Sequence, residues 1–486
     1  MKPSASQRTA GLSILLLLGI FLTGTTGFDP FHEIGMFNGK RILEVSLFLL
    51  LMSVTLLNPY LRDSFAQVLA IVPRWIVFAL VVAGLLGTIS ALRFEHPGYG
   101  LLDVAMLTLL VLGILATASA RRISEDGFDR IALLIVIAIG LIAVVTELMG
   151  FLAAWMMGFE FSFNKMLVRF FHPRFYNHLQ TFSIPLIAAL PFVFGPSRKL
   201  KAVAVTLIGL QWFLLLVSGG RGSVVSLTAA FTLVALLIPS NRRAWLSIQF
   251  AGLVLGVVIF FGAMQVNQLV SSDGRQFVSQ SIGRPMAHTS GRSHMWQISW
   301  HQVLAEPMLG TGPSRFSCDL SPKTVAHAHS FPVTIMAEWG FPAFILIMLV
   351  CIRLGWGLIF KCRKLQTGDA RTDILIAMLG CSIIAGTIHA LVSGVLIMPA
   401  SQVMAVLICG WALGRLSVSK TLKPTGNKAS VLVLATALVT AALVSNFSFG
   451  ELKKMDLRTR QQSTQILMAP RYWQSGHSCS YFYENH

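Results

Sequence analysis

The sequence predicts an all-α polytopic membrane protein with about 12–13 transmembrane helices and one large loop outside the membrane. Two observations lead to this prediction. First, the 486 residues are 55% hydrophobic and only 12% charged, whereas soluble domains carry about 25% charged residues. Second, apolar runs long enough to cross a bilayer, which takes roughly 17–25 residues, recur along the whole chain.

Short basic loops between the apolar runs set the predicted orientation. The chain carries 38 Lys and Arg against 20 Asp and Glu. Many of the basic residues cluster in short loops, as is typical of the cytoplasmic side, so orientation explains the charge and no nucleic-acid partner is expected. Lys40, Arg41 and the basic tail break the pattern. The expected spans lie near 11–26, 43–58, 75–93, 101–119, 131–150, 179–196, 202–217, 223–238, 245–265, 332–352, 374–392, 396–414 and 430–446.

The chain divides into four parts by the length of its loops. The apolar run at the N-terminus has no clear small-residue cleavage site, so we interpret it as the first span rather than as a signal peptide. The parts are the N-terminal transmembrane helices (1–265, with an outside hairpin tip at 218–223), an outside loop (266–331), the C-terminal transmembrane helices (332–446) and an outside tail (447–486).

The hairpin tip Ser218-Gly-Gly-Arg221-Gly-Ser223 is a candidate anion site. Glycines let a backbone approach a ligand closely, and the arginine fork matches phosphate oxygens. An arginine that only snorkels to the membrane surface is the simpler alternative. Because basic residues are less expected outside the membrane, we favour a role for Arg221 in binding.

The outside loop carries further ionisable side chains. Arg292 precedes Trp296 and Trp300 at helical spacing, so it is expected to open a short amphipathic helix. Such a helix fits either an interfacial anchor or a functional site. His329 and His327 lie just before the next span, and histidine is the usual general base near neutral pH. Chemistry alone does not choose between the two histidines.

Three more residues, Glu338, Arg169 and Arg174, are candidate supporting groups. Glu338 follows His329 by nine residues and is about half a turn out of phase with it on a helix. We therefore expect Glu338 to cap a backbone or to pair with an arginine rather than to touch His329. Arg169 and Arg174 would extend an anionic site, or would belong to an interfacial segment.

No metal and no cofactor are expected. Neither Cys nor His shows zinc-site spacing, and the acidic residues of the outside segments are too scattered to hold a divalent cation.

The polar segments together resemble the O-antigen ligase and polymerase superfamily of bacterial inner-membrane proteins. The ordered pattern is Ser-Gly-Arg then Trp at 290–296, Gly-Thr-Gly at 310–312, and His329 followed by Glu338-x-Gly-x-Pro342, with the arginine hairpin at 218–223 before them. Ser330 departs from the pattern, because the family commonly has Asn after this histidine.

The resemblance implies transfer of a glycan from a polyprenyl diphosphate carrier to an acceptor on the periplasmic face. His329 would activate a sugar hydroxyl, and Arg221 and Arg292 would hold the diphosphate. The implied donor is undecaprenyl diphosphate-linked O-antigen, and the implied acceptor is the lipid A-core or another glycan. The family leans towards a ligase. A polymerase using the same donor is the first alternative, and a non-catalytic glycolipid transporter is the second.

The cysteines give one further prediction. By the expected topology only Cys318 and Cys479 lie outside the membrane, on the oxidising side. A disulfide between them would clamp the tail onto the outside loop, whereas two free thiols are the alternative.

Overall fold

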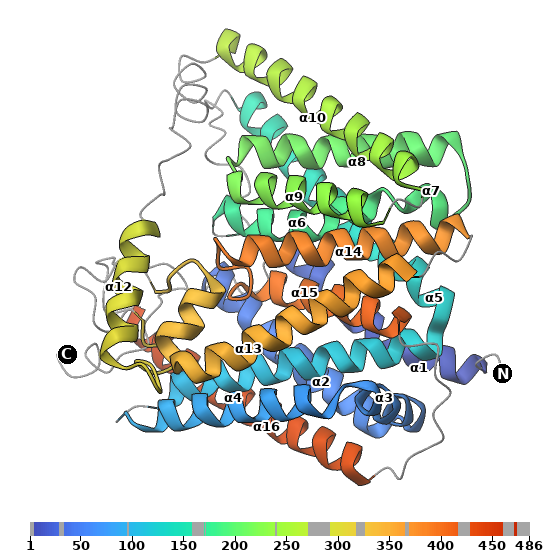
Figure 1. Cartoon of the computed structure of the whole chain (residues 1–486). Helices are drawn as coiled ribbons and strands as arrows, with labels where there is room; N and C mark the ends of the chain where they lie inside the picture. The colour runs from blue at the N-terminus through green and yellow to red at the C-terminus, as the bar shows by residue number, and fades with distance from the viewer. Residues whose placement is uncertain are drawn as a thin grey trace.

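The computed structural model is helical throughout the residues that it describes, with no strand among them, which confirms the predicted all-α class (Figure 1). The described residues are 4–28, 34–94, 97–157, 170, 172–238, 241–270, 292–316, 326–364, 369–416, 428–459 and 471–473. The helices are α1 (Ala5–Gly27), α2 (Met36–Leu57), α3 (Pro59–Ile71), α4 (Arg74–Leu92), α5 (Gly98–Met156), α6 (Pro173–Ile187), α7 (Leu190–Val193), α8 (Arg198–Val217), α9 (Arg221–Leu237), α10 (Arg242–Val270), α12 (Arg292–Ala305), α13 (Phe331–Lys364), α14 (Ala370–Ala390), α15 (Pro399–Leu416) and α16 (Lys428–Thr459).

Local sequence signals explain where helices begin. Ser4 caps α1 in a capping box with Gln7. α6 begins with Pro173, and the ring of His172 accepts a hydrogen bond from the backbone N–H of Arg174 at 3.1 Å. Proline suits the first helical position, where its missing N–H has no intrahelical partner, and the cap side chains satisfy N–H groups that the helix leaves unpaired.

Nine helices of the described part are long and apolar enough to cross a membrane, or ten with the bent pair of α2 and α3. This number of membrane-spanning helices is lower than the 12–13 predicted from the sequence, for three reasons. α5 merges two expected spans across a kink at Glu125. α6 and α9 have only 15 and 17 residues, and α2 is bent by 98° from α3. The chain is thus a multi-pass membrane protein.

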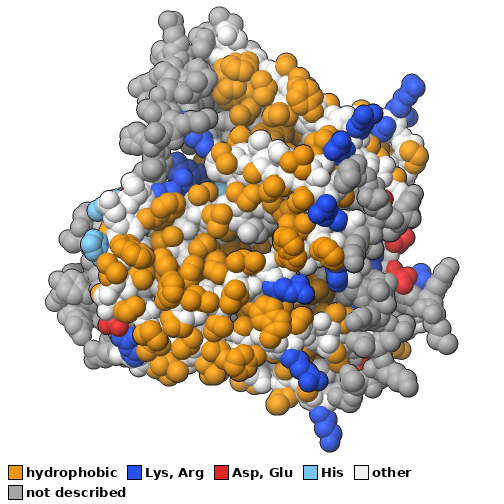
Figure 2. All heavy atoms as spheres, viewed as in Figure 1, with side chains coloured by type: hydrophobic (Ala, Val, Ile, Leu, Met, Phe, Trp, Pro, Cys, Tyr) orange, Lys and Arg blue, Asp and Glu red, His pale blue; other side chains and the backbone are white. Residues whose placement is uncertain are grey.

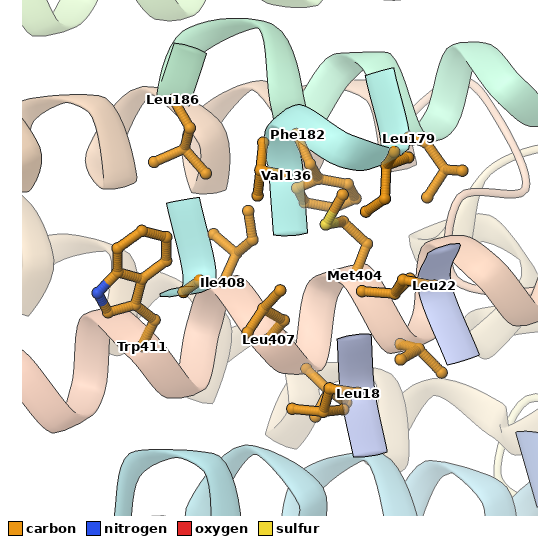
Figure 3. Packing of buried hydrophobic residues seen from close by; sticks show 14 of the residues in the cluster. Leu18, Leu22, Val136, Leu179, Phe182, Leu186, Met404, Leu407, Ile408 and Trp411 are labelled. Atoms are coloured by element: carbon orange, nitrogen blue, oxygen red, sulfur yellow. The ribbon is translucent and has the colours of Figure 1, made fainter. Parts of the chain in front are cut away.

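The centre of the bundle lies where α1, α5, α6 and α15 meet (Figure 3). Leu18, Val136, Phe182 and Leu407 pack there and are at most 3% exposed. Lipid is as apolar as leucine, so close packing holds such helices together. Gly11 illustrates the closeness: a Cβ at this position of α1 would lie 2.5 Å from the carbonyl oxygen of Ala120 in α5.

The outer surface of the bundle is apolar as well. Large side chains such as Phe78 of α4 and Phe250 of α10 are each 67% exposed. Figure 2 shows hydrophobic side chains spread over the middle of this face. Exposed apolar side chains at these positions face lipid rather than water.

One end of the bundle is basic. The carbonyl of Arg8 accepts from Ser124 at 3.1 Å, Arg371 pairs with Asp126 at 3.3 Å, and Arg415 pairs with Asp129 nearby. Most Lys and Arg side chains visible in Figure 2 lie towards this side, on the right. α12 lies at the opposite end from the start of α1 (Figure 1).

Candidate active site

Several segments that are distant in sequence meet at the end of the bundle that carries α12. Trp296 of α12 donates to the carbonyl of Ala328, in the turn before α13, at 3.1 Å. The Thr181 hydroxyl of α6 lies 2.9 Å from Nδ1 of His389 at the end of α14 and 3.0 Å from the hydroxyl of Ser223 in α9. α6, α9, α12, α13 and α14 therefore all contribute to this region.

The Gly-Thr-Gly segment docks onto a break in α13. Gly340 leaves the helical conformation with φ 82°, and Gly310 has φ 66°. Thr311 and Gly312 donate to the carbonyls of Ala337 and Glu338 at 2.9 and 3.0 Å. A Cβ at Gly340 would lie 2.3 Å from the carbonyl oxygen of Met308. Glycine is required here because the backbone conformation and the close contact exclude a side chain.

Glu338 holds the chain beside this break. Its carboxylate is fully buried and accepts hydrogen bonds from the backbone N–H groups of Ser314 and Phe316, both at 3.0 Å. It also accepts from Arg471 at 2.6 Å. Glu338 thus binds backbone groups and an arginine, the two roles that its helical phase suggested.

α12 begins at Arg292, where the sequence placed the start of a short helix. Met295 of α12 packs with Phe316 and Ala328 in a small buried cluster. This cluster fixes α12, and with it Arg292, against the turn that carries the two histidines.

The two histidines have different environments. His327 is 1% exposed, and its Nδ1 accepts from the backbone N–H of His329 at 3.1 Å. A Cβ at Gly394 would lie 2.8 Å from the His327 ring. His329 is only partly buried and has φ 51°, an uncommon conformation for a side chain other than glycine. The structure therefore gives His327 a packing role and leaves His329 as the more accessible imidazole.

Arg221 is the first residue of α9, so the tip of the hairpin is shorter than expected. The tip is held by Asn177 of α6, whose side-chain carbonyl accepts from the Ser218 hydroxyl at 2.8 Å. Gly222 lies against His389, where a Cβ would come within 3.1 Å of the ring. Arg221 is exposed at this helix start.

Positive charge surrounds His329. Burial lowers the pKa of its imidazole most, followed by the charges of Arg292, Arg174 and His172, and together they bring it from 6.5 to about 4. Burial, followed by Arg174, also lowers the pKa of the Arg292 guanidinium. Figure 2 shows Lys and Arg side chains gathered in a hollow between α12 and the start of α9. Near neutral pH the arrangement combines a neutral base with fixed positive charge.

Some predicted residues lie outside the described part of the chain. These are Arg169, Ser290, Cys318 and Cys479, so the role of Arg169 and the disulfide stay predictions. Arg174 is described and contributes its charge to the environments of His329 and Arg292. Ser330, the departure from the family pattern, is buried and lines a cavity together with Asp103, Gly394 and Arg471.

The sequence interpretation missed three histidines of this region: His172, His178 and His389. His178 is within hydrogen-bonding distance of Ser393 at 2.8 Å, and its ring lies 5.0 Å from that of His389. A signal was available for His389, because an ionisable side chain at the end of an apolar run is itself a functional-site hypothesis.

No three His, Cys, Asp or Glu side chains within the described ranges are grouped so that they could hold a metal ion.

The fold and these side chains define a multi-pass membrane protein with an arginine- and histidine-lined site at one end of its helices. Residues 204–348 match the family model described as O-antigen ligase. This match supports the O-antigen ligase and polymerase superfamily, whose members are glycosyltransferase-like enzymes. The matched segment includes Arg221, Arg292, His329 and Glu338. A comparison with curated proteins found no match.

Proposed function

We propose that the protein transfers an O-antigen polysaccharide from undecaprenyl diphosphate to a sugar hydroxyl of the lipid A-core. The observation that carries the proposal is the environment of His329. Its imidazole is kept neutral by burial and by the charges of Arg292 and Arg174. A neutral imidazole can accept a proton from a hydroxyl, and the guanidinium groups suit a diphosphate. The family match supports a reaction of this type.

In the proposed reaction the acceptor hydroxyl oxygen attacks the anomeric carbon of the donor glycan while its proton passes to His329. The bond from that carbon to the diphosphate oxygen breaks, and its electron pair leaves with undecaprenyl diphosphate. Arg221 and Arg292 stabilise the negative charge that grows on the leaving oxygen. Loss of the proton from the imidazolium to water then restores the base.

The donor would itself strengthen the base. Positive neighbours lower the pKa of an imidazole, and a bound anion offsets them. Binding of the diphosphate beside Arg292 and Arg174 therefore raises the pKa of His329 above its value of about 4 in the free protein. Proton transfer is most efficient when the pKa of the base lies near the working pH.

We propose that the transfer needs no metal, because the arginines supply the positive charge that divalent cations provide in many enzymes acting on diphosphates. We also place the site on the periplasmic face of the inner membrane. Basic ends of membrane helices favour the cytoplasm, and the basic end with Arg371 and Arg415 is opposite to α12.

A deletion strain tests this function against the alternatives. A ligase predicts that long-chain polymer disappears from the lipid A-core while carrier-linked polymer accumulates. Carrier-linked single repeat units instead would indicate a polymerase. A transporter is less favoured, because the arginines and histidines cluster at one end of the bundle, and its loss would leave carrier-linked material on the cytoplasmic side.

A further inference from the structure

A short piece of the C-terminal tail is buried inside the bundle, beside the candidate site. Arg471, Tyr472 and Trp473 are 5%, 6% and 1% exposed. The guanidinium of Arg41 in α2 donates to the carbonyl of Tyr472 at 3.1 Å, and the Tyr472 hydroxyl lies 2.5 Å from that of Ser448 in α16. This segment lies far beyond residues 204–348, which match the family.

The side chain of Arg471 joins two carboxylates, the fully buried Glu338 and the partly exposed Asp103. Its Nη2 donates to Asp103 of α5 at 2.8 Å and to Glu338 of α13 at 2.6 Å. The same Glu338 carboxylate accepts the backbone N–H groups of Ser314 and Phe316. The Glu338 carboxylate therefore links Arg471 to the backbone of the outside loop.

That backbone is one wall of the candidate site. Phe316 packs with Met295 of α12 and with Ala328, which lies between His327 and His329 in the chain. The charge of Arg471 also acts on His327. Burial lowers the pKa of the His327 imidazole most, followed by the charges of His329 and Arg471.

Arg41 of α2 links the tail to the opposite wall. Arg41, which holds the tail carbonyls, donates to the carbonyl of Ile397 at 2.6 Å. Ile397 belongs to the turn after α14, where Ser393 contacts His178 at 2.8 Å and Gly394 lies against the His327 ring. The buried tail segment is therefore connected to one wall through Glu338 and to the other through Arg41.

We propose that Arg471 is a positioning residue for the transfer reaction, and this inference rests on the proposed function. The ion pair with Arg471 favours the ionised form of Glu338 and holds its carboxylate in place. Glu338 fixes the backbone at Ser314 and Phe316, and that backbone fixes the relative positions of Arg292 and His329. Removing one partner of a buried ion pair leaves an uncompensated charge. Glu338 would then take up a proton or move, and would lose its hold on the two N–H groups.

The test compares Arg471→Met with Arg121→Met in the full-length purified protein. Arg121 is a matched control, because it is also 5% exposed and pairs with a buried carboxylate, Asp129, at 3.0 Å. It lies at the basic end of the bundle, away from the site. Thermal unfolding gives the general loss of stability. The two specific readouts are kcat per folded molecule and hydrogen exchange of the peptide amides at Ser314 and Phe316.

We expect both variants to unfold at lower temperature, but only Arg471→Met to lose roughly 10²-fold in kcat, as a misplacement of about 1 Å can cause. Only this variant should lose exchange protection at Ser314 and Phe316. Arg471→Lys keeps the charge and should recover part of kcat. If Arg471→Met does not fold, Arg471→Lys is judged by the same two readouts against Arg121→Lys.

Either unchanged kcat or unchanged exchange protection in the Arg471 variant would overturn the proposal. Equal losses of kcat in the Arg471 and Arg121 variants would reduce Arg471 to a general stabilising role and would overturn it too. If wild-type protein transfers no glycan, the proposed function fails. The exchange experiment then decides separately whether Arg471 holds the loop.

Discussion

At the residue scale, the structure gives different environments to two histidines that chemistry alone did not distinguish. His327 is almost fully buried and accepts the backbone N–H of His329. His329 is partly buried and lies within the field of Arg292 and Arg174. A general base has to be accessible and deprotonated at the working pH, and these two features of His329 support its proposed role.

The arginines should act on the donor. Arg292→Ala and Arg221→Ala are each expected to lower transfer by roughly 10²–10³-fold, as when one group that stabilises developing charge is removed. Lysine should restore activity only in part, because it lacks the planar fork. Initial rates at varied donor concentration measure the effect.

Arg93→Ala is the control for the arginine variants. Its ion pair with Glu306, at 2.8 Å, is partly exposed, and exposed pairs contribute at most about 1 kcal/mol. Activity that survives in Arg292→Ala and Arg221→Ala as well as in Arg93→Ala would exclude a shared diphosphate site.

The pH dependence should report the charges around His329. Because the base has to be neutral, kcat/KM should fall as the pH falls through about 4, the pKa in the free protein. In the pH profile of kcat, the acidic fall should lie at higher pH than in the profile of kcat/KM, because bound diphosphate favours the protonated imidazole. Arg292→Ala should move the kcat/KM limb upwards. A wild-type kcat/KM limb near 6.5 would contradict the described environment.

Unfolding has to be followed at each pH of that experiment. The pKa values of His329 and His172 are both lowered from 6.5 to about 4 in the folded state. The unfolded chain therefore binds more protons between these values, and the free energy of unfolding decreases as the pH falls through this range.

At the scale of single elements, the break in α13 determines where the outside loop packs against the helix. The loop reaches the helix through backbone hydrogen bonds from Thr311, Gly312 and Phe341. These bonds need the helix to open at Gly340, which lies between Glu338 and Pro342. The Glu-x-Gly-x-Pro spacing in the sequence is thus explained by the docking of the loop.

Gly340→Ala should destabilise the protein by more than 1 kcal/mol. Gly340 has a positive φ, and such a backbone conformation costs about 1–2 kcal/mol for a residue with a Cβ. The new Cβ would also lie 2.3 Å from the Met308 carbonyl oxygen. Gly355→Ala in the same helix is the control, because a Cβ there meets nothing within 4 Å. It should leave stability unchanged or raise it by about 0.5–1 kcal/mol. Equal melting temperatures of the two variants would contradict the role of Gly340.

Hydropathy and spacing predicted the helical class and most of the helices, because an apolar run of sufficient length can cross a membrane only as a helix or as part of a barrel. They also predicted that Arg292 opens a helix. They did not predict the contacts of Arg471 with Asp103 and Glu338. These residues are separated by well over 100 positions in the sequence, so no local pattern reports that they meet.

At the scale of the whole molecule, the two ends of the bundle differ in kind. Exposed and paired basic residues mark the end with Arg371 and Arg415. Histidines and the buried tail segment mark the other. Arg41, which broke the basic-inside pattern in the sequence, is a buried structural residue that binds the carbonyls of Tyr472 and Ile397.

The predicted disulfide between Cys318 and Cys479 would fasten the tail further. Phe316 and Arg471, which precede these cysteines in the chain, both bind Glu338. Closing so long a loop stabilises by about 4–5 kcal/mol on the loop-entropy model. Mass spectrometry without reductant should find the two cysteines linked. Cys479 that is alkylated without prior reduction would show that the bridge is absent.

The most direct test of the account is transfer by purified protein from an undecaprenyl diphosphate-linked glycan to lipid A-core, in excess chelator. We expect wild-type protein and His327→Asn, which keeps an acceptor for the His329 N–H, to form product without metal. His329→Ala should fold normally and lose roughly 10²–10⁴-fold in rate. Transfer by His329→Ala at the wild-type rate, or a strict need for a divalent cation, would contradict the proposed chemistry.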